Sequence, residues 1–188
     1  MHYHCEVWLP EKVHGKSVEV LREDQEAMQA IMEPILAPYG EESGSKKKIK
    51  FWDYWRIGGR WTGEHDGYNP SQDWVNYKTC WLCHGSGVRS DVPGKEKVIC
   101  NSCHGTGAAL EYDPQYHVGD IMRVKDIRDA YTYYTLVLAR PRTVVLQSEK
   151  WMGMGKGFKA GKWGKDIKKD LAGYGIRDGW LVTVDCHS

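Results

Sequence analysis

Two pairs of cysteines with the same spacing carry the clearest chemistry in this sequence. Cys80 and Cys83 form the first pair, and Cys100 and Cys103 form the second, each within the pattern Cys-x-x-Cys-x-Gly-x-Gly. A Cys-x-x-Cys turn places two thiolates about one edge of a tetrahedron apart, and the glycines let the backbone fold back so that amides approach the sulfur atoms. Two such turns complete a closed four-thiolate shell. The spacing therefore predicts one structural zinc ion.

Two other interpretations of these cysteines stay open: pairing as disulfides, and a catalytic zinc in which His84 or His104 replaces a cysteine. Six cysteines in 188 residues are far fewer than secreted disulfide scaffolds contain. A closed shell of four thiolates also leaves no coordination position for a reacting water molecule. Both observations favour a structural metal over either alternative.

A second candidate site lies at the two ends of the sequence. Residues 2 to 9 and 180 to 186 alternate as strands do, and we expect these first and last strands to be antiparallel neighbours in one sheet. The face toward the helices then carries Tyr3, Cys5, Val7, Val182, Val184 and Cys186, and its cysteines are expected to be buried apolar residues rather than a redox pair. The opposite face carries His2, His4, Glu6, Thr183, Asp185 and His187.

His2, His4, Asp185 and His187 are the candidates for chemistry on that polar face. Histidine together with carboxylate is a common composition of metal sites and of acid–base sites, so this group could ligate a second metal or act in catalysis. The alternative is a polar group near a sheet edge that needs no function, because terminal residues fray.

Basic residues indicate two candidate anion sites. Arg56 and Arg60 lie at the end of an aromatic strand and could clamp an anion beside the clustered histidines. Lys156, Lys159 and Lys162 lie among glycines, whose amides could join the ammonium groups around a phosphate. This spacing matches no phosphate loop, and a flexible solvated loop is the favoured alternative.

The aromatic strand itself could form a platform for nucleic acid. Trp52, Tyr54 and Arg56 alternate on one side of it, and the tyrosines of residues 131–134 could lie beside them. Aromatic side chains on an open sheet face stack bases in RNA-recognition domains. The sequence lacks the strand signature of those domains, and aromatic residues packed in the core are the alternative.

Overall charge and hydropathy exclude little beyond a membrane span. Lys and Arg number 26 against 25 Asp and Glu, so net charge gives no argument for nucleic acid or membrane as a partner. No window approaches the roughly 18 apolar residues that cross a bilayer, and the opening residues do not resemble a secretory leader. We expect a protein of the bacterial cytoplasm.

The predicted elements come in the order strand, helix, strand, insertion, strand, helix, strand. This order is typical of an α+β, ferredoxin-like βαββαβ fold with both helices on one face of an antiparallel sheet. The zinc-binding insertion falls between the second and third core strands. The predicted divisions are 1–59 for the first half of the core, 60–118 for the zinc-knuckle insertion and 119–188 for the second half of the core.

Several motifs resemble those of known groups. Tyr54-Trp55-Arg56-Ile57-Gly58-Gly59-Arg60-Trp61, Trp151-Met152-Gly153-Met154-Gly155 and Val184-Asp185-Cys186-His187 resemble motifs of an uncharacterised family from phages and actinobacterial mobile elements. The two cysteine knuckles are similar to the cysteine-rich region of DnaJ chaperones and to small zinc-knuckle regulators such as anti-TRAP. These resemblances imply a phage or mobile-element origin and a zinc that holds a protein-binding surface.

The preferred function is that of a zinc-stabilised regulatory protein that binds a host or phage protein. No Ser, Cys or Lys nucleophile stands in a recognisable activating motif, which disfavours an enzyme. The alternative is a metal-assisted hydrolase or nucleotide-processing enzyme that uses the histidines and Asp185 at the two ends. A further alternative is an RNA- or DNA-binding module, and no membrane partner is expected.

Overall fold

The computed structural model describes residues 2–40, 52–94, 97–111, 114–128, 134–139, 144–147 and 167–187. The chain forms two compact units. The first comprises Met1–Tyr68 and Tyr116–Ser188, and the second comprises Asn69–Gln115. The second unit lies inside the range 60–118 and contains all four paired cysteines, whereas residues 60–68 and 116–118 belong to the first unit.

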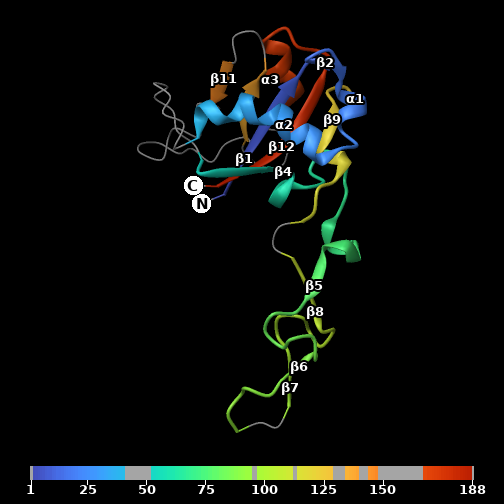
Figure 1. Ribbon diagram of the computed structural model, residues 1–188, viewed down its shortest axis with the longest axis vertical. Coiled ribbons are helices and arrows are strands. Elements are labelled where there is room, and N and C mark those ends of the chain that lie inside the picture. Colours follow the sequence, from blue (N-terminus) through green and yellow to red (C-terminus); the bar gives the residue numbers. More distant parts are fainter. Residues whose placement is uncertain are drawn as a thin grey trace. The chain divides into compact units, whose positions relative to one another are not determined.

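A six-stranded sheet forms the centre of the first unit (Figure 1). Its strands, in spatial order, are β11 (Val144–Gln147), β10 (Tyr134–Leu138), β1 (His2–Leu9), β12 (Trp180–His187) and β4 (Tyr54–Ile57), with β9 (Ile121–Arg123) also paired to β12. The pair β1–β12 is antiparallel along its whole length, from His2↔His187 to Leu9↔Trp180. The predicted pairing of the first and last strands is therefore confirmed.

The sheet is mixed, which corrects the prediction of a purely antiparallel one. β10 pairs parallel with β1 in the register His4↔Tyr134 to Trp8↔Leu138, while β10 and β11 form the expected antiparallel hairpin. Parallel neighbours need a long connection, and the chain between β1 and β10 is long enough to provide it. Alternation in a sequence reveals which residues share a face but not the direction in which a strand runs.

Helix α2 (Gln25–Leu36) covers one face of this sheet. The Asp24 side chain caps it by accepting a hydrogen bond from the Ala27 amide at 3.1 Å, and the short helix α1 (Val18–Leu21) precedes it. Pro34 lies in its last turn, and a 3₁₀ turn at Ala37–Tyr39 follows. The apolar stripe of α2 buries a core whose main members are Met28, Ile31, Met32, Leu36, Cys5, Val7, Leu9, Val182, Val184 and Cys186.

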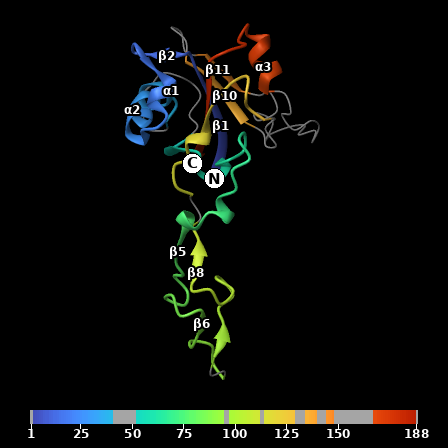
Figure 2. The same cartoon turned by 90° about the vertical axis from the view of Figure 1, so that its right-hand side faces the viewer.

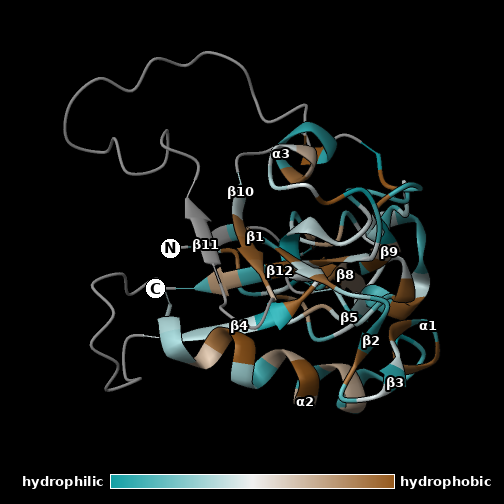
Figure 3. Ribbon diagram, turned by 90° about the horizontal axis from the view of Figure 1, so that it is seen from above, coloured by the Kyte–Doolittle hydropathy of each residue, from teal (hydrophilic) through white to brown (hydrophobic). Residues whose placement is uncertain are grey.

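Helix α3 (Ile167–Gly173) covers the opposite face, which corrects the prediction of two helices on one side (Figures 2 and 3). Its residues Ile167 and Leu171 pack in a second core with Tyr134, Leu136, Leu138 and Leu181. Adjacent residues of a strand point to opposite faces, so Leu181 joins this core while Val182 joins the core under α2. Helix α3 is so short that its apolar residues do not indicate in the sequence which face of the sheet it covers.

The remaining elements of the first unit are short. A two-stranded hairpin joins β2 (Lys12–Val13) to β3 (Lys16–Ser17). After β4 the chain forms a 3₁₀ turn at Gly59–Trp61, and another at Val118–Asp120 leads into β9. The segment between Gly58 and Tyr68 lies on the same face of the sheet as α3. It covers the polar residues of that face, His4, Glu6 and Thr183, which are buried.

The second unit has two small two-stranded sheets in place of an ordinary core. Two 3₁₀ turns, Pro70–Gln72 and Trp74–Asn76, precede the antiparallel pair β5 (Tyr77–Thr79) and β8 (Ala108–Leu110). The pair β6 (Val88–Arg89) and β7 (Val98–Ile99) follows the first cysteine knuckle. Its buried cluster consists of the four cysteines with Leu82 and Ala109 packed against them. So small an apolar cluster indicates that the cysteines hold this unit together.

No helix among the described residues is long and apolar enough to cross a membrane.

Candidate metal centres

The four paired cysteines converge in the second unit. All four are buried, and none of them forms a disulfide. The Sγ atoms of Cys80 and Cys100 lie 3.7 Å apart, and those of Cys83 and Cys103 lie 3.6 Å apart. All four sulfur atoms lie within 4.8 Å of one another. The sulfur atoms of a tetrahedral zinc–thiolate shell lie about 3.8 Å apart, so these cysteines could hold a metal ion together.

The glycines of the two knuckles explain why the pattern Cys-x-x-Cys-x-Gly-x-Gly occurs twice. The amides of Gly87 and Gly107 each donate to the second sulfur of their own knuckle at 3.3 Å. A β-carbon on Gly87 would lie 2.3 Å from the carbonyl oxygen of Gly105, and one on Gly107 would lie 2.3 Å from that of Gly85. The two knuckles therefore interlock through backbone contacts that only glycine permits.

The surroundings lower the pKa of Cys80 and Cys103 and so favour thiolate there, whereas burial raises the pKa of Cys100. Burial raises the pKa of Cys80, but the backbone amides of Cys83 and Leu82 outweigh it and lower that pKa to about 6. Deprotonated sulfur is the form that binds metals. His84 and His104 have positive φ, are exposed, and lie outside the cluster of four sulfur atoms. The donors that converge are thus four sulfurs.

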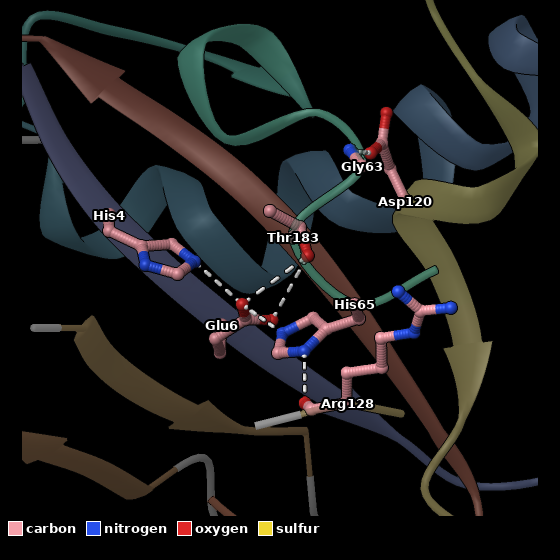
Figure 4. Close-up of polar contacts among 7 residues, drawn as sticks. All are labelled: His4, Glu6, Gly63, His65, Asp120, Arg128 and Thr183. Carbon is pink, nitrogen blue, oxygen red and sulfur yellow. Dashed lines mark hydrogen bonds and ion pairs between the residues drawn. The ribbon is translucent and has the colours of Figure 1, made fainter. Parts of the chain in front are cut away.

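A second group of metal-ligand atoms lies in the first unit, on the sheet face opposite α2 (Figure 4). Glu6 of β1 is fully buried, and its Oε1 accepts from His4 Nε2 at 2.6 Å and from His65 Nε2 at 2.7 Å. The Thr183 hydroxyl of β12 lies 3.3 and 3.4 Å from the two Glu6 oxygens. His4 and Glu6 are two residues apart on one strand, so their side chains share a face, whereas His65 approaches from the segment after β4.

The pKa values of this group reflect a buried ion pair. Burial raises the pKa of Glu6, but the charges of His65 and then His4 outweigh it and lower that pKa to about 2. Burial lowers the pKa of His65, but the Glu6 charge and hydrogen bond raise it to about 9. Nδ1 of His65 donates to the Arg128 carbonyl oxygen at 2.7 Å, which fixes the orientation of the ring.

Glycines bring the segment that carries His65 close to the sheet. Gly59 has φ +58°, and its backbone lies against Asp185 of β12, whose Oδ2 accepts from the Arg60 amide at 3.1 Å. Gly63 lies against the Tyr68 carbonyl oxygen, which a β-carbon at residue 63 would approach to 1.9 Å. The Gly58-Gly59-Arg60-Trp61 segment therefore packs closely against the buried carboxylates of Asp120 and Asp185.

The four residues predicted to cluster at the chain ends are neighbours, but they bind in separate pairs. His2 Nδ1 lies 2.8 Å from Asp185 Oδ1, and His187 Nδ1 lies 3.0 Å from Asp53 Oδ1. The rings of His2 and His187 meet edge to face with centroids 4.9 Å apart. His4 is opposite Asp185 in the strand register, yet its Nε2 contacts Glu6.

Of the predicted anion-binding residues, Arg56 and Arg60 belong to the described part of the chain. Arg56 lies directly across from Asp185 in the β4–β12 register, and Arg60 is exposed in the 3₁₀ turn that follows. Lys156, Lys159 and Lys162 lie outside the described residues.

The predicted aromatic platform does not assemble from Trp52 and Tyr54. Trp52 is buried in the core under α2, with its ring 6.1 Å from that of Tyr39. Tyr54 is exposed and stacks on His187 with centroids 5.1 Å apart. The tyrosines at positions 131 and 133 lie outside the described residues, whereas Tyr134 is buried beside His4.

Asp120 is a further buried acid that the sequence did not single out. Its Oδ1 accepts from the Gly63 amide at 3.0 Å, while its Oδ2 and the nearby Thr62 hydroxyl have no hydrogen-bond partner. Burial raises the pKa of Asp120 to about 7. Neither Asp120 nor His65 stands in a motif, and the only sequence signal near them is the glycine-rich run that lets the backbone approach them.

No protein-family model, curated protein or solved structure matches this chain. The two candidate centres therefore depend on the geometry of the chain itself. The proposed kinship with phage and mobile-element proteins stays a prediction.

Proposed function

We propose that this chain is a zinc-stabilised binding protein whose second unit presents an apolar surface to a protein partner. The observation that carries the proposal is the placement of exposed apolar side chains. Of the nine exposed large apolar residues in the described part of the chain, six belong to the second unit: Trp74, Val75, Trp81, Val88, Ile99 and Leu110. Exposed apolar groups gathered on one small unit are typical of interaction sites.

Trp81 and Ile99 are the most informative members of this surface. Trp81 is 73% exposed although it follows the buried Cys80, and Ile99 is 69% exposed although it precedes the buried Cys100. The knuckles thus hold the sulfur atoms inward and these apolar side chains outward. Tryptophan is enriched among the residues that dominate binding energy at protein interfaces.

Zinc is the metal that we propose for the cysteine site. Four thiolates in tetrahedral arrangement suit zinc or an iron–sulfur cluster, and single zinc ions are usual where two Cys-x-x-Cys turns meet. The unit has little other apolar core, so the metal would supply much of its folding free energy. Free cysteines persist in a reducing compartment, so we place the proposed function in the cytoplasm, in line with the phage resemblance.

Charge favours a protein partner over nucleic acid. Residues 69–115 contain four basic and five acidic side chains, so this unit has no excess of positive charge for phosphates. A nucleic-acid interface remains the alternative proposal. It predicts binding that weakens steeply with salt, whereas apolar contacts through Trp81 change little between low and moderate salt.

The test is site-specific photo-crosslinking of the full-length chain in its host cells. A photoreactive residue at position 81 should give a discrete crosslinked protein, and the same residue at the exposed Lys16 of the first unit should not. Cys83→Ser should abolish the product at position 81 because the knuckle no longer holds that residue in place. Crosslinks at 81 that equal those at 16, or that join only RNA or DNA, would refute the proposal.

A second candidate function is metal-assisted hydrolysis or nucleotide processing at the ends of β1 and β12. The observation in its favour is that His2 and His187 lie side by side, each with a carboxylate partner and each partly exposed. Arg56, across from Asp185, could meet an anionic substrate. Replacement of His2 and His187 by alanine would remove such an activity and leave crosslinking at position 81 intact.

A further inference from the structure

We propose that His4, Glu6 and His65 form a binding site for a divalent transition-metal ion in the first unit, separate from the cysteine site. Nε2 of His4, Nε2 of His65 and a carboxylate oxygen of Glu6 all lie within 4.8 Å of one another. All three side chains are buried. The site is independent of the proposed protein-binding surface, since every ligand belongs to the first unit.

The hydrogen bonds of His65 point to a cation between it and Glu6. Nδ1 of His65 faces the Arg128 carbonyl oxygen at 2.7 Å, so this nitrogen carries a hydrogen. In neutral imidazole the other nitrogen, Nε2, then presents a lone pair, and it faces Glu6 Oε1 at 2.7 Å. Two lone pairs at this distance repel, so a proton lies between the two atoms, and it is this proton that a metal ion would replace. A backbone carbonyl behind a histidine is also the usual support of a metal ligand.

The surroundings of His4 hold its ring toward the same point. Trp61 stacks on it with ring centroids 5.1 Å apart and planes 7° apart, and Tyr134 meets it edge-on at 6.1 Å. Thr183 lies beside the Glu6 oxygens from the neighbouring strand. Figure 4 shows His4 and His65 converging on Glu6 from opposite sides. Ligands packed from behind in this way lose little side-chain freedom when they bind an ion.

The donor set selects the class of metal. Two imidazole nitrogens and one carboxylate oxygen suit zinc and its first-row neighbours, whereas magnesium and calcium prefer sites made of oxygen alone. Bonds of about 2.0–2.2 Å would separate the donor atoms by about 3.3 Å in a tetrahedral site. The nitrogens therefore need to move from Glu6 by several tenths of an ångström when an ion binds.

The alternative is that each histidine Nε2 carries a proton that it donates to Glu6. The cluster would then be a buried ion pair without a metal ion. Metal content separates the two occupants. Full-length protein without a histidine tag would be incubated with zinc, dialysed, and measured for zinc per chain by native mass spectrometry. We expect two zinc ions in the unsubstituted chain and one in both Glu6→Gln and His65→Gln.

Two control variants assign the ions. His117→Gln should keep both ions, because His117 forms a similar histidine–carboxylate pair with Asp66 at 3.3 Å outside the cluster. Cys83→Ser should lose the cysteine-bound ion and keep the other. Cobalt added to a chain with zinc already at the cysteines should then show ligand-field absorption without thiolate charge-transfer bands.

The proposal is overturned if the unsubstituted chain binds a single zinc ion, or if folded Glu6→Gln and His65→Gln chains both keep two. Circular dichroism in the near ultraviolet reports whether each variant is folded. If Glu6→Gln does not fold, His65→Gln and the cobalt spectrum of the unsubstituted chain decide the question. Cobalt bands that arise from thiolate ligation alone would also overturn it.

Discussion

Gly59 lies directly against Asp185, so closely that a β-carbon on Gly59 would come within 2.4 Å of the Asp185 β-carbon. This contact lets the Arg60 amide reach the Asp185 carboxylate and brings the following residues over the sheet. His65 reaches Glu6 from this segment. The buried polar cluster therefore depends on a residue that has no side chain.

Gly59→Ala should destabilise the first unit by about 2–4 kcal/mol, because it combines a positive φ of 58° with a steric clash. The matched control is Gly15→Ala. Gly15 also has a positive φ, of 79°, but a β-carbon there would meet nothing within 4 Å, so strain alone should cost about 1 kcal/mol. Urea unfolding followed by tryptophan fluorescence measures both. Equal losses in the two variants would show that the contact with Asp185 is unimportant.

Asp120→Asn should change how stability depends on pH. The pKa of Asp120 is raised from 3.8 to about 7 in the folded chain, so the folded state holds a proton that the unfolded state releases. Its contribution to stability is thus fully present below pH 3.8 and is lost as pH rises through about 7. The asparagine variant cannot ionise. Its free energy of unfolding relative to that of the native chain should therefore rise over this interval, by up to about 4 kcal/mol.

Unfolding in urea at pH 5 and at pH 8 measures this gain for Asp120→Asn. Asparagine keeps the oxygen that accepts from the Gly63 amide, so the fold should persist. Asp178→Asn, which replaces an exposed acid, serves as the control. Its difference in free energy of unfolding from the native chain should be the same at the two pH values. A difference that is the same at pH 5 and pH 8 would mean that Asp120 is ionised in the folded chain.

Loss of the proposed zinc ion should unfold the second unit selectively. Cys83→Ser breaks the shell of four sulfur atoms around which this unit is built, while the first unit has two apolar cores of its own. Limited proteolysis should then cut within residues 69–115 at least ten times faster, with cleavage sites read by mass spectrometry. Cys186→Ala replaces a cysteine of the main core and should leave zinc content unchanged. Uniform cleavage along the Cys83→Ser chain would contradict this division.

Trp81→Ser should abolish partner binding without reducing stability. The side chain is largely exposed, so its loss should change the free energy of unfolding by less than about 0.5 kcal/mol. Binding is read from the crosslink at position 99 in the Trp81→Ser chain, since Ile99 belongs to the same apolar surface. Zinc content and the melting temperature should match those of the native chain. A large drop in melting temperature would show that Trp81 stabilises the fold and would contradict this prediction.

Local patterns in the sequence predicted those features that depend on short spacing. The two cysteine motifs correctly indicated that Cys80, Cys83, Cys100 and Cys103 lie together, because each motif fixes its own turn. Alternation correctly placed Cys5 in the core and Glu6 on the opposite face of β1. The α+β class followed from the same periodicities.

Features that depend on distant segments were not predictable in this way. The parallel direction of β10 and the side taken by α3 leave no trace in hydrophobic periodicity. His65 is 59 residues from Glu6 and comes from an irregular segment, so no spacing rule connects the two. Its position depends on the backbone conformation of Gly58 and Gly59, which tertiary contacts determine.

The central place of β12 affects the order in which the chain can fold during synthesis. β12 pairs with β1, β4 and β9, yet it follows all of them in the sequence. Residues 180–187 must therefore emerge from the ribosome before the sheet of the first unit can close, and the edge of β1 that pairs with β12 stays unpaired until then. Residues 69–115 are contiguous and emerge earlier, so the four cysteines of this unit could bind a metal ion while the rest of the chain is still being made.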